Sequence, residues 1–245
     1  MSRGGRVSIV GAGPGAPDLI TVRGARRLAE ADVIVYDRLV DPSLLDLAPR
    51  HAERIYAGKA PGRHAMTQEE INRLLVERAS RGLHVVRLKG GDPLFYGRGE
   101  EECLHVLRAG IPCEIIPGVP SPHGAAAEHL LPLAGRGYSS TLAYTTAVQA
   151  GGTPMPASRI EALARAADTL VVLMGASRLV EVLEAAGRAR PREYAAIVEA
   201  ATTGRSRLHL ARIEEILSSP PRVEPPALII VGGAARWRAE NAPYY

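Results

Sequence analysis

Short apolar runs alternate with amphipathic segments from the start of the chain. Val7 to Val10 is a β-rich run that ends at a Gly/Pro turn, and Leu19 to Ala31 carries apolar residues at helical spacing. A second β-rich run, Val33 to Tyr36, follows directly. The order strand, loop, helix, strand predicts a unit of α/β structure.

The same alternation continues to residue 116. Thr67 to Arg81 is predicted as a helix, because Thr67 and Glu70 have the spacing of a capping box, and Val85 to Leu88 is predicted as the next strand. Gly99 to Ala109 is predicted as a helix and Cys113 to Ile116 as a strand. Helices that alternate with strands in this way favour a parallel sheet.

Pro117 and Gly118 end the last of these strands and predict a domain boundary. We therefore expect one α/β domain over residues 1–118 and a second over 119–245. The tail from Trp237 to Tyr245 shows no pattern that predicts an element. The rest of the second half repeats the pattern of the first and predicts strands over 141–146, 170–174, 195–198 and 227–231, with helices over 160–167 and 178–186.

Charge and hydropathy narrow the classes of partner. The net charge of +4 would attract any polyanion, but the arginines are scattered singly, so nucleic acid is not expected. The longest apolar runs, such as Ala227 to Val231, are far shorter than the roughly 20 residues that span a bilayer, so no membrane helix is expected. No signal peptide follows Arg3 and Arg6, and we expect a cytoplasmic protein.

The two cysteines, Cys103 and Cys113, fall in a predicted helix and a predicted strand without a partner motif. Thiols are therefore expected in place of a disulfide or a zinc site. His123 and His129 have no Cys or Asp at ligand or nucleophile spacing, and no metal site is predicted.

The first loop has the outline of a dinucleotide-binding fingerprint, with GxGxxA at residues 11–16 after a strand and Asp37 at the end of the next strand. In that fingerprint a helix begins inside the motif, whereas Pro14 and Pro17 keep this chain irregular through Asp18. A Rossmann oxidoreductase that binds NAD or FAD is one alternative. A plain strand-to-helix turn capped by Asp18 is another.

Several ordered blocks together carry a more specific signal than any one motif. The blocks are Val-Gly-Ala-Gly-Pro-Gly-Ala-Pro-Asp-Leu-Ile-Thr at 10–21, Val-Tyr-Asp-Arg-Leu-Val at 35–40, Gly58-Lys59, Gly62-Arg63-His64, Gln-Glu-Glu-Ile-Asn at 68–72, Arg-Leu-Lys-Gly-Gly-Asp-Pro at 87–93 and Tyr-Gly-Arg-Gly-Glu-Glu at 96–101. They resemble the uroporphyrinogen-III C-methyltransferases of the tetrapyrrole (corrin) methyltransferase family, densely over residues 7–139. The resemblance implies two α/β domains with a cofactor cleft between them.

The resemblance further implies an enzyme that methylates uroporphyrinogen III at C2 and C7 and gives precorrin-2, on the route to sirohaem and cobalamin. Its methyl donor would be S-adenosyl-L-methionine, which leaves as S-adenosyl-L-homocysteine, and the enzyme would be a homodimer acting on a small-molecule tetrapyrrole. The alternatives are a methyltransferase for a later corrin intermediate, the Rossmann oxidoreductase and a non-catalytic tetrapyrrole carrier. The later corrin methyltransferase would differ in its substrate, the oxidoreductase would bind NAD or FAD, and the carrier would bind a tetrapyrrole without consuming the methyl donor.

The site residues follow from the same resemblance. Substrate carboxylates would be held by Arg38, Lys59, His64 and Arg136, since arginines grip carboxylates bidentately. Arg98 and Glu101 are the predicted catalytic pair, although at this i, i+3 spacing they could instead bond to each other. The predicted cofactor contacts, which favour backbone groups and close approach at glycine, are Pro14, Gly90, Gly91, Asp92, Phe95, Pro120, Ser121, Met174 and Ala201.

Three segments depart from the family pattern. Residues 117–122 read Pro-Gly-Val-Pro-Ser-Pro where Pro-Gly-Ile-Thr-Ser-Ala is usual, which removes a hydroxyl and two backbone donors. Residues 132–137 and 145–147 also differ, although Arg136 is retained. These departures concern the segments closest to the predicted cofactor and substrate.

Overall fold

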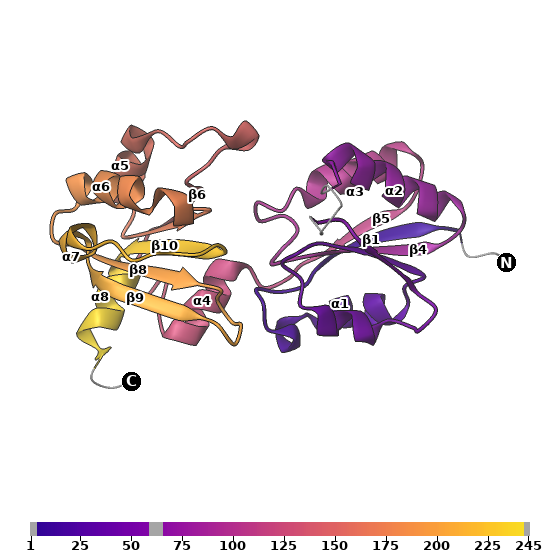
Figure 1. Cartoon of the computed structure of the whole chain (residues 1–245), viewed down its shortest axis with the longest axis horizontal. Coiled ribbons are helices and arrows are strands. Elements are labelled where there is room, and N and C mark those ends of the chain that lie inside the picture. Colours follow the sequence, from indigo (N-terminus) through magenta and orange to yellow (C-terminus); the bar gives the residue numbers. More distant parts are fainter. Residues whose placement is uncertain (1–3, 59–65, 243–245) are drawn as a thin grey trace. The chain divides into compact units, whose positions relative to one another are not determined.

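The computed structural model of the chain describes residues 4–58 and 66–242. The chain divides into two compact units, 1–121 and 122–245, a little beyond the boundary predicted after residue 118. Each unit contains one five-stranded sheet with helices packed against it, and Figure 1 shows the first unit in indigo to magenta and the second in pink to yellow. The predicted fold class of two α/β domains is confirmed.

The sheet of unit 1 is parallel throughout, as predicted, with strand order β3-β2-β4-β1-β5. Its strands are β1 (Arg6–Gly11), β2 (Val33–Tyr36), β3 (Glu53–Tyr56), β4 (His84–Lys89) and β5 (Cys113–Ile116). Strand β3 was not predicted, because it is a four-residue edge strand that begins with two exposed charged residues.

Three helices cover this sheet, α1 (Val22–Ala29), α2 (Gln68–Ser80) and α3 (Gly99–Arg108). Helix α2 begins as predicted, with a capping box between Thr67 and Glu70. Helix α1 begins after Thr21, whose hydroxyl accepts the N–H of Gly24 at 3.1 Å, and not after Asp18. No helix therefore starts inside the glycine motif, contrary to a dinucleotide-binding fingerprint.

Side chains of successive strand residues enter two separate cores. Val10, Ile34 and Leu88 pack on the α1 face, whereas Ile9 and Val35 pack on the face covered by α2 and α3. Figure 1 shows α1 on one side of the sheet and α2 and α3 on the other. The second face is the one on which charged residues are also buried.

Helix α3 and strand β5 are joined covalently, by a disulfide between Cys103 and Cys113 with Cα atoms 5.8 Å apart. The prediction of free thiols was wrong. The short connection from α3 to β5 brings the two cysteines together in the fold, and the sequence contains no pair motif that shows this contact.

The sheet of unit 2 is mixed, with strand order β6-β7-β10-β8-β9. Strands β6 and β7 are parallel, whereas β10 runs antiparallel to β7 and β8, and β9 antiparallel to β8. Unlike the sheet of unit 1, this sheet is not parallel throughout, because β8 and β9 form a hairpin that only antiparallel strands allow. The strands are β6 (Leu142–Thr146), β7 (Thr169–Leu173), β8 (Tyr194–Glu199), β9 (Arg207–Arg212) and β10 (Ala227–Gly232).

Helices α5 (Ala157–Ala166) and α6 (Leu179–Ala189) lie close to their predicted ranges. Helices α4 (Ser121–His129), α7 (Ile213–Ser218) and α8 (Gly233–Glu240) were not predicted, and α8 covers part of the tail that showed no pattern. None of the helices in the described residues is long and apolar enough to cross a membrane.

Candidate active site

The carboxyl ends of β1 and β4 form a topological switch point in unit 1. The two strands are neighbours in the sheet, but the chain leaves β1 toward α1 on one face and leaves β4 toward α3 on the other. In open parallel sheets, ligands bind outside the carboxyl ends of the strands where connections diverge in this way. The candidate site therefore begins at the loops that follow β1 and β4.

Backbone hydrogen bonds join these two loops. The N–H of Gly91 donates to the carbonyl oxygen of Gly13 at 2.7 Å, and the N–H of Ala12 donates to that of Lys89 at 2.7 Å. Both glycines have left-handed backbone conformations, with φ of +84° at Gly13 and +70° at Gly91. Glycine is needed here because a side chain disfavours that conformation.

The loop after β5 packs against the same two loops, backbone against backbone. A Cβ atom on Gly11 would lie 2.5 Å from the nitrogen of Gly118 and 2.7 Å from the oxygen of Gly91. Asp92 fastens this contact, since its Oδ2 accepts the N–H of Gly118 at 3.0 Å and its Oδ1 accepts the N–H of Leu94 at 2.8 Å. Both oxygens of the predicted cofactor anion Asp92 thus bind backbone donors of unit 1.

The backbone at Gly91 is open on one side. A Cβ atom on Gly91 would have a single neighbour among the described atoms, the nitrogen of Ser121 at 3.9 Å. In unit 1 the structure therefore brings together most of the predicted cofactor residues on three connected loops: Pro14 on the loop after β1, Gly90, Gly91, Asp92 and Phe95 on the loop after β4, and Pro120 and Ser121 after β5.

The loop after β4 is tightly wound before it enters α3. Tyr96 and Arg98 have left-handed φ values of 57° and 60°, and the N–H of Gly99 donates to the oxygen of Pro93 at 2.9 Å. Non-glycine residues in this conformation cost on the order of 1–3 kcal/mol each and concentrate at functional sites. The left-handed residues make 92–99 a candidate functional segment.

Arg98 and Glu101 bond to each other, as their spacing allowed. Arg98 Nη2 lies 2.6 Å from Glu101 Oε2, and both side chains are about half exposed. The hydrogen bond raises the pKa of Arg98 and lowers the pKa of Glu101. A carboxylate with a lowered pKa is a weaker proton acceptor, so the geometry favours Glu101 as a partner that orients Arg98.

Sequence reasoning missed a cluster of charges below this loop, which we call the buried charge cluster. It consists of the buried Arg87, Lys89 and Glu102 and the partly exposed Asp37. Arg87, Lys89 and Glu102 are at most 6% exposed. Burial, and then the nearby Arg87, lower the pKa of Lys89. The available signal was the pair of cations at alternate positions of the strand 84–89, whose other residues, apart from His84, are apolar.

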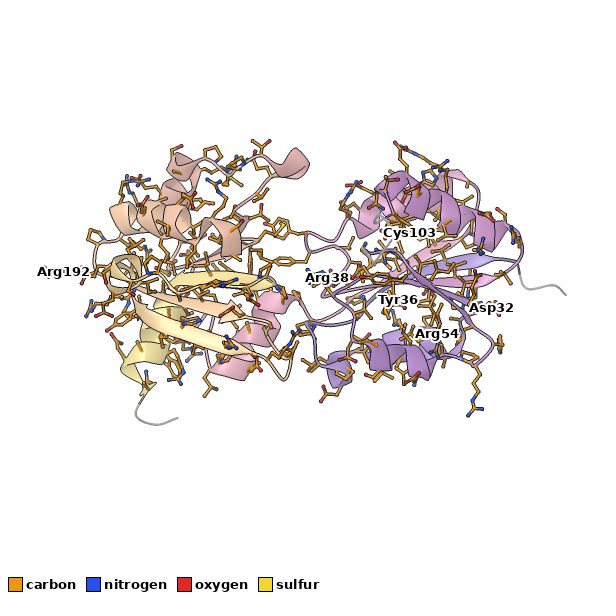
Figure 2. The ribbon with its side chains drawn as sticks, in the orientation of Figure 1. Asp32, Tyr36, Arg38, Arg54, Cys103 and Arg192 are labelled. Atoms are coloured by element: carbon orange, nitrogen blue, oxygen red, sulfur yellow. A yellow bond between two sulfur atoms is a disulfide. The ribbon has the colours of Figure 1, made fainter. Side chains whose placement is uncertain are left out.

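The predicted substrate-binding residues are placed unevenly. Arg38 is exposed and follows β2, so that Asp32 and Arg38 lie at opposite ends of this strand (Figure 2). Lys59 and His64 lie outside the described residues. Arg136 is exposed in the turn that Gly135 and Ser139 close in unit 2.

Unit 2 has a carboxyl edge of its own. Both β7 and β8 run antiparallel to β10, so their carboxyl ends share one edge of the sheet, where Met174 and Ala201 follow them. Met174 and both neighbours of Ala201 have left-handed φ values, 55°, 44° and 63°. The turn with Arg136 lies at the opposite edge, since Ser139 Oγ is 2.8 Å from Oγ1 of Thr169 at the start of β7.

Comparisons with known proteins agree on one family. The family model for tetrapyrrole (corrin/porphyrin) methylases matches residues 6–217. A uroporphyrin-III C-methyl transferase from Thermus thermophilus, solved alone and in complex with S-adenosylhomocysteine, is 43% identical, with a TM-score of 0.80 over 95% of this chain and 94% of that one. Cobalt precorrin-4 methyltransferase is 29% identical, with a TM-score of 0.83 over 94% of this chain and 95% of that one.

Among curated proteins, the siroheme synthase of Chromobacterium violaceum is 45% identical over 237 residues. The matched region is 94% of this chain but 49% of that protein. The chain thus spans about half the length of the curated relatives it matches.

Proposed function

The chain belongs to the tetrapyrrole (corrin/porphyrin) methylase family, and from this premise we propose that it methylates uroporphyrinogen III at C2 and C7 to give precorrin-2. The methyl donor in this proposal is S-adenosylmethionine. The observation that carries it is the near full-length similarity to a uroporphyrin-III C-methyltransferase that binds S-adenosylhomocysteine.

The loops of unit 1 suit this cofactor. Its ribose and amino acid ends need hydrogen-bonding groups at close range, and glycine allows the backbone to supply them. Gly91 has open space in front of its Cα, and the backbone of Ser121 borders that space. We propose that Gly90, Gly91, Phe95, Pro14, Pro120 and Ser121 contact the cofactor, with Asp92 holding the loops in place. Met174 and Ala201 remain predicted contacts of unit 2.

S-adenosylmethionine supplies a methyl group already activated by its sulfonium. The protein has to align a pyrrole carbon with that methyl and exclude water, and strong acid–base chemistry is not required for the transfer. We propose that Arg98, held by Glu101, binds a substrate carboxylate near the cofactor loop. Arg38 is exposed at the same edge of the sheet and is the second candidate in unit 1.

The test is an anaerobic incubation of the protein with uroporphyrinogen III and S-adenosylmethionine, followed by absorbance and mass spectrometry. Two added methyl groups per tetrapyrrole are expected. No methyl transfer from a protein that binds S-adenosylhomocysteine would reject uroporphyrinogen III as the substrate.

A second candidate function is methylation of a later corrin intermediate. The observation in its favour is the similarity to cobalt precorrin-4 methyltransferase, which has the higher TM-score at the lower identity. The same assay with a cobalt precorrin separates the two candidate functions. The first predicts methylation of uroporphyrinogen III only, and the second predicts methylation of the cobalt precorrin only.

We also propose that the protein acts as a homodimer in the cytoplasm, on a small-molecule tetrapyrrole and without nucleic acid or membrane. Light scattering of the purified protein tests the dimer, for which a mass twice that of the 26.1 kDa chain is expected. A monomer at the concentration of the activity assay would reject it.

A further inference from the structure

Glu102 stands at the centre of the buried charge cluster. Its Oε1 accepts hydrogen bonds from Lys89 Nζ at 2.8 Å, from Gln68 Nε2 at 3.1 Å and from Arg87 Nε at 3.3 Å. Its Oε2 is buried and has no hydrogen-bond partner among the described residues. Glu102 itself is 0% exposed.

Core stability does not require this arrangement. Charges lose hydration when they are buried, and a buried ion pair often stabilises a fold no better than apolar side chains of the same size. A buried carboxylate oxygen without a donor adds a further cost. Buried ion pairs do hold their side chains in one geometry, because breaking a pair leaves a buried charge unpaired, which is strongly destabilising.

The cluster is placed where a fixed geometry matters. Lys89 is the last residue of β4, and Glu102 lies in the first turn of α3, so the ion pair between them closes the base of the loop 90–98. That loop contains the left-handed residues Tyr96 and Arg98. Strained residues persist only where the surrounding structure holds them.

The cluster also reaches the loop after β2. Arg87 Nη2 lies 3.3 Å from Asp37 Oδ2 at the end of β2, and Asp37 Oδ1 accepts the N–H of Leu39 at 3.1 Å. Leu39 in turn packs on Gly90, where an added Cβ would lie 2.7 Å from the Leu39 Cβ. The loops after β2 and β4 therefore share one buried support.

We propose that Glu102 is a positioning residue, which ties β4 to α3 at the two ends of the loop 90–98 through Lys89, connects them through Arg87 to the loop after β2, and thereby sets the affinity for the methyl donor. This inference rests on the proposed function for the identity of the ligand. Glu102 acts through the loop, and no contact between Glu102 and the ligand is involved.

The experiment compares Glu102→Gln and Lys89→Met with Glu100→Gln, a control on the exposed side of the same helical turn. Affinity for S-adenosylhomocysteine is measured by calorimetry well below the melting temperature, and amide hydrogen exchange is followed across residues 90–98. We expect Glu102→Gln and Lys89→Met to weaken binding by about tenfold or more, because a hydrogen bond to the ligand that is lost when the loop shifts costs about this factor in affinity. Exchange in the loop should become faster, and Glu100→Gln should behave as the wild type.

A lower melting temperature with unchanged affinity and unchanged exchange in the loop would show that Glu102 is only structural and would overturn the proposal. If Glu102→Gln does not fold, Lys89→Met decides on the same criteria. If the wild type does not bind S-adenosylhomocysteine, the proposed function fails. The exchange measurement then still tests whether the cluster holds the loop.

Discussion

A substitution at Gly91 can show separately how much a side chain costs in folding, through the left-handed backbone, and how much it costs in binding, by blocking a ligand. In Gly91→Ala the only neighbour of the added Cβ within the described part of the chain is the Ser121 nitrogen, at 3.9 Å, so no steric clash with that part is expected in the free protein. Alanine at a φ of +70° costs about 1–2 kcal/mol. For a protein of this size that corresponds to a fall in melting temperature of roughly 2–8 °C.

The effect on binding should be much larger than the effect on folding. A ligand in van der Waals contact with the Gly91 Cα would have to retreat by on the order of 1 Å to accommodate the new methyl group, and a displacement of this size can cost about a hundredfold. We therefore expect affinity for S-adenosylhomocysteine, measured by calorimetry, to fall by roughly that factor.

Gly110→Ala is the matched control. Gly110 has a φ of +75° and, among the described atoms, no neighbour within 4 Å of its ideal Cβ position. It lies beyond the end of α3, away from the loops of the candidate site. It should lower the melting temperature to a similar extent and leave binding unchanged. Equal affinity of Gly91→Ala and the wild type would refute a cofactor in front of Gly91.

The other predictions concern the substrate, pH and the disulfide. Arg98→Ala should reduce methyl transfer while affinity for S-adenosylhomocysteine stays nearly the same, and unchanged turnover would remove Arg98 from the mechanism. Burial lowers the pKa of His84, which titrates near 6.5 in the unfolded chain, so unit 1 should lose stability as pH falls below about 6.5. Urea unfolding at several pH values checks this, and His84→Gln should flatten the slope. Cys113→Ala removes the bond to Cys103 and should lower the free energy of unfolding by roughly 2–4 kcal/mol. A wild type that unfolds identically with and without reductant would contradict a stabilising disulfide.

The elements predicted best were those with strong local signals. The capping box at Thr67 and Glu70 defined the start of α2, and the apolar run with Pro117 behind it defined β5. Strand β9 and helix α8 were missed because their side chains are mostly half-buried and carry no clear period. The antiparallel pairing of β10 with β7 and β8 joins segments that are separated in the sequence, and the hydrophobic pattern does not encode such pairing.

The site was predicted unevenly for a similar reason. The glycines at 90 and 91 could be found because each position favours a residue without a side chain. Gly91 has a positive φ, and an added Cβ on Gly90 would lie 2.7 Å from the Leu39 Cβ. The role of Asp92 as an acceptor for Gly118, and the position of Glu102 below the loop, result from contacts between separate strands. Neither contact can be predicted from a local sequence motif.

The backbone contacts among the loops of Gly11, Gly91 and Gly118 have a consequence for how this protein can change. A side chain at Gly11 or Gly118 would collide with backbone atoms, and at Gly91 both the left-handed backbone and the proposed ligand disfavour one. The groups that these positions bring together are main-chain groups, which mutation does not alter. Exposed neighbours such as Arg38 and Leu94 carry no such restriction. A complete map of single substitutions should therefore show a small group of positions that cannot be replaced, surrounded by positions that accept many residues. Such a scaffold can acquire a new molecule to receive the methyl group and keep its methyl donor.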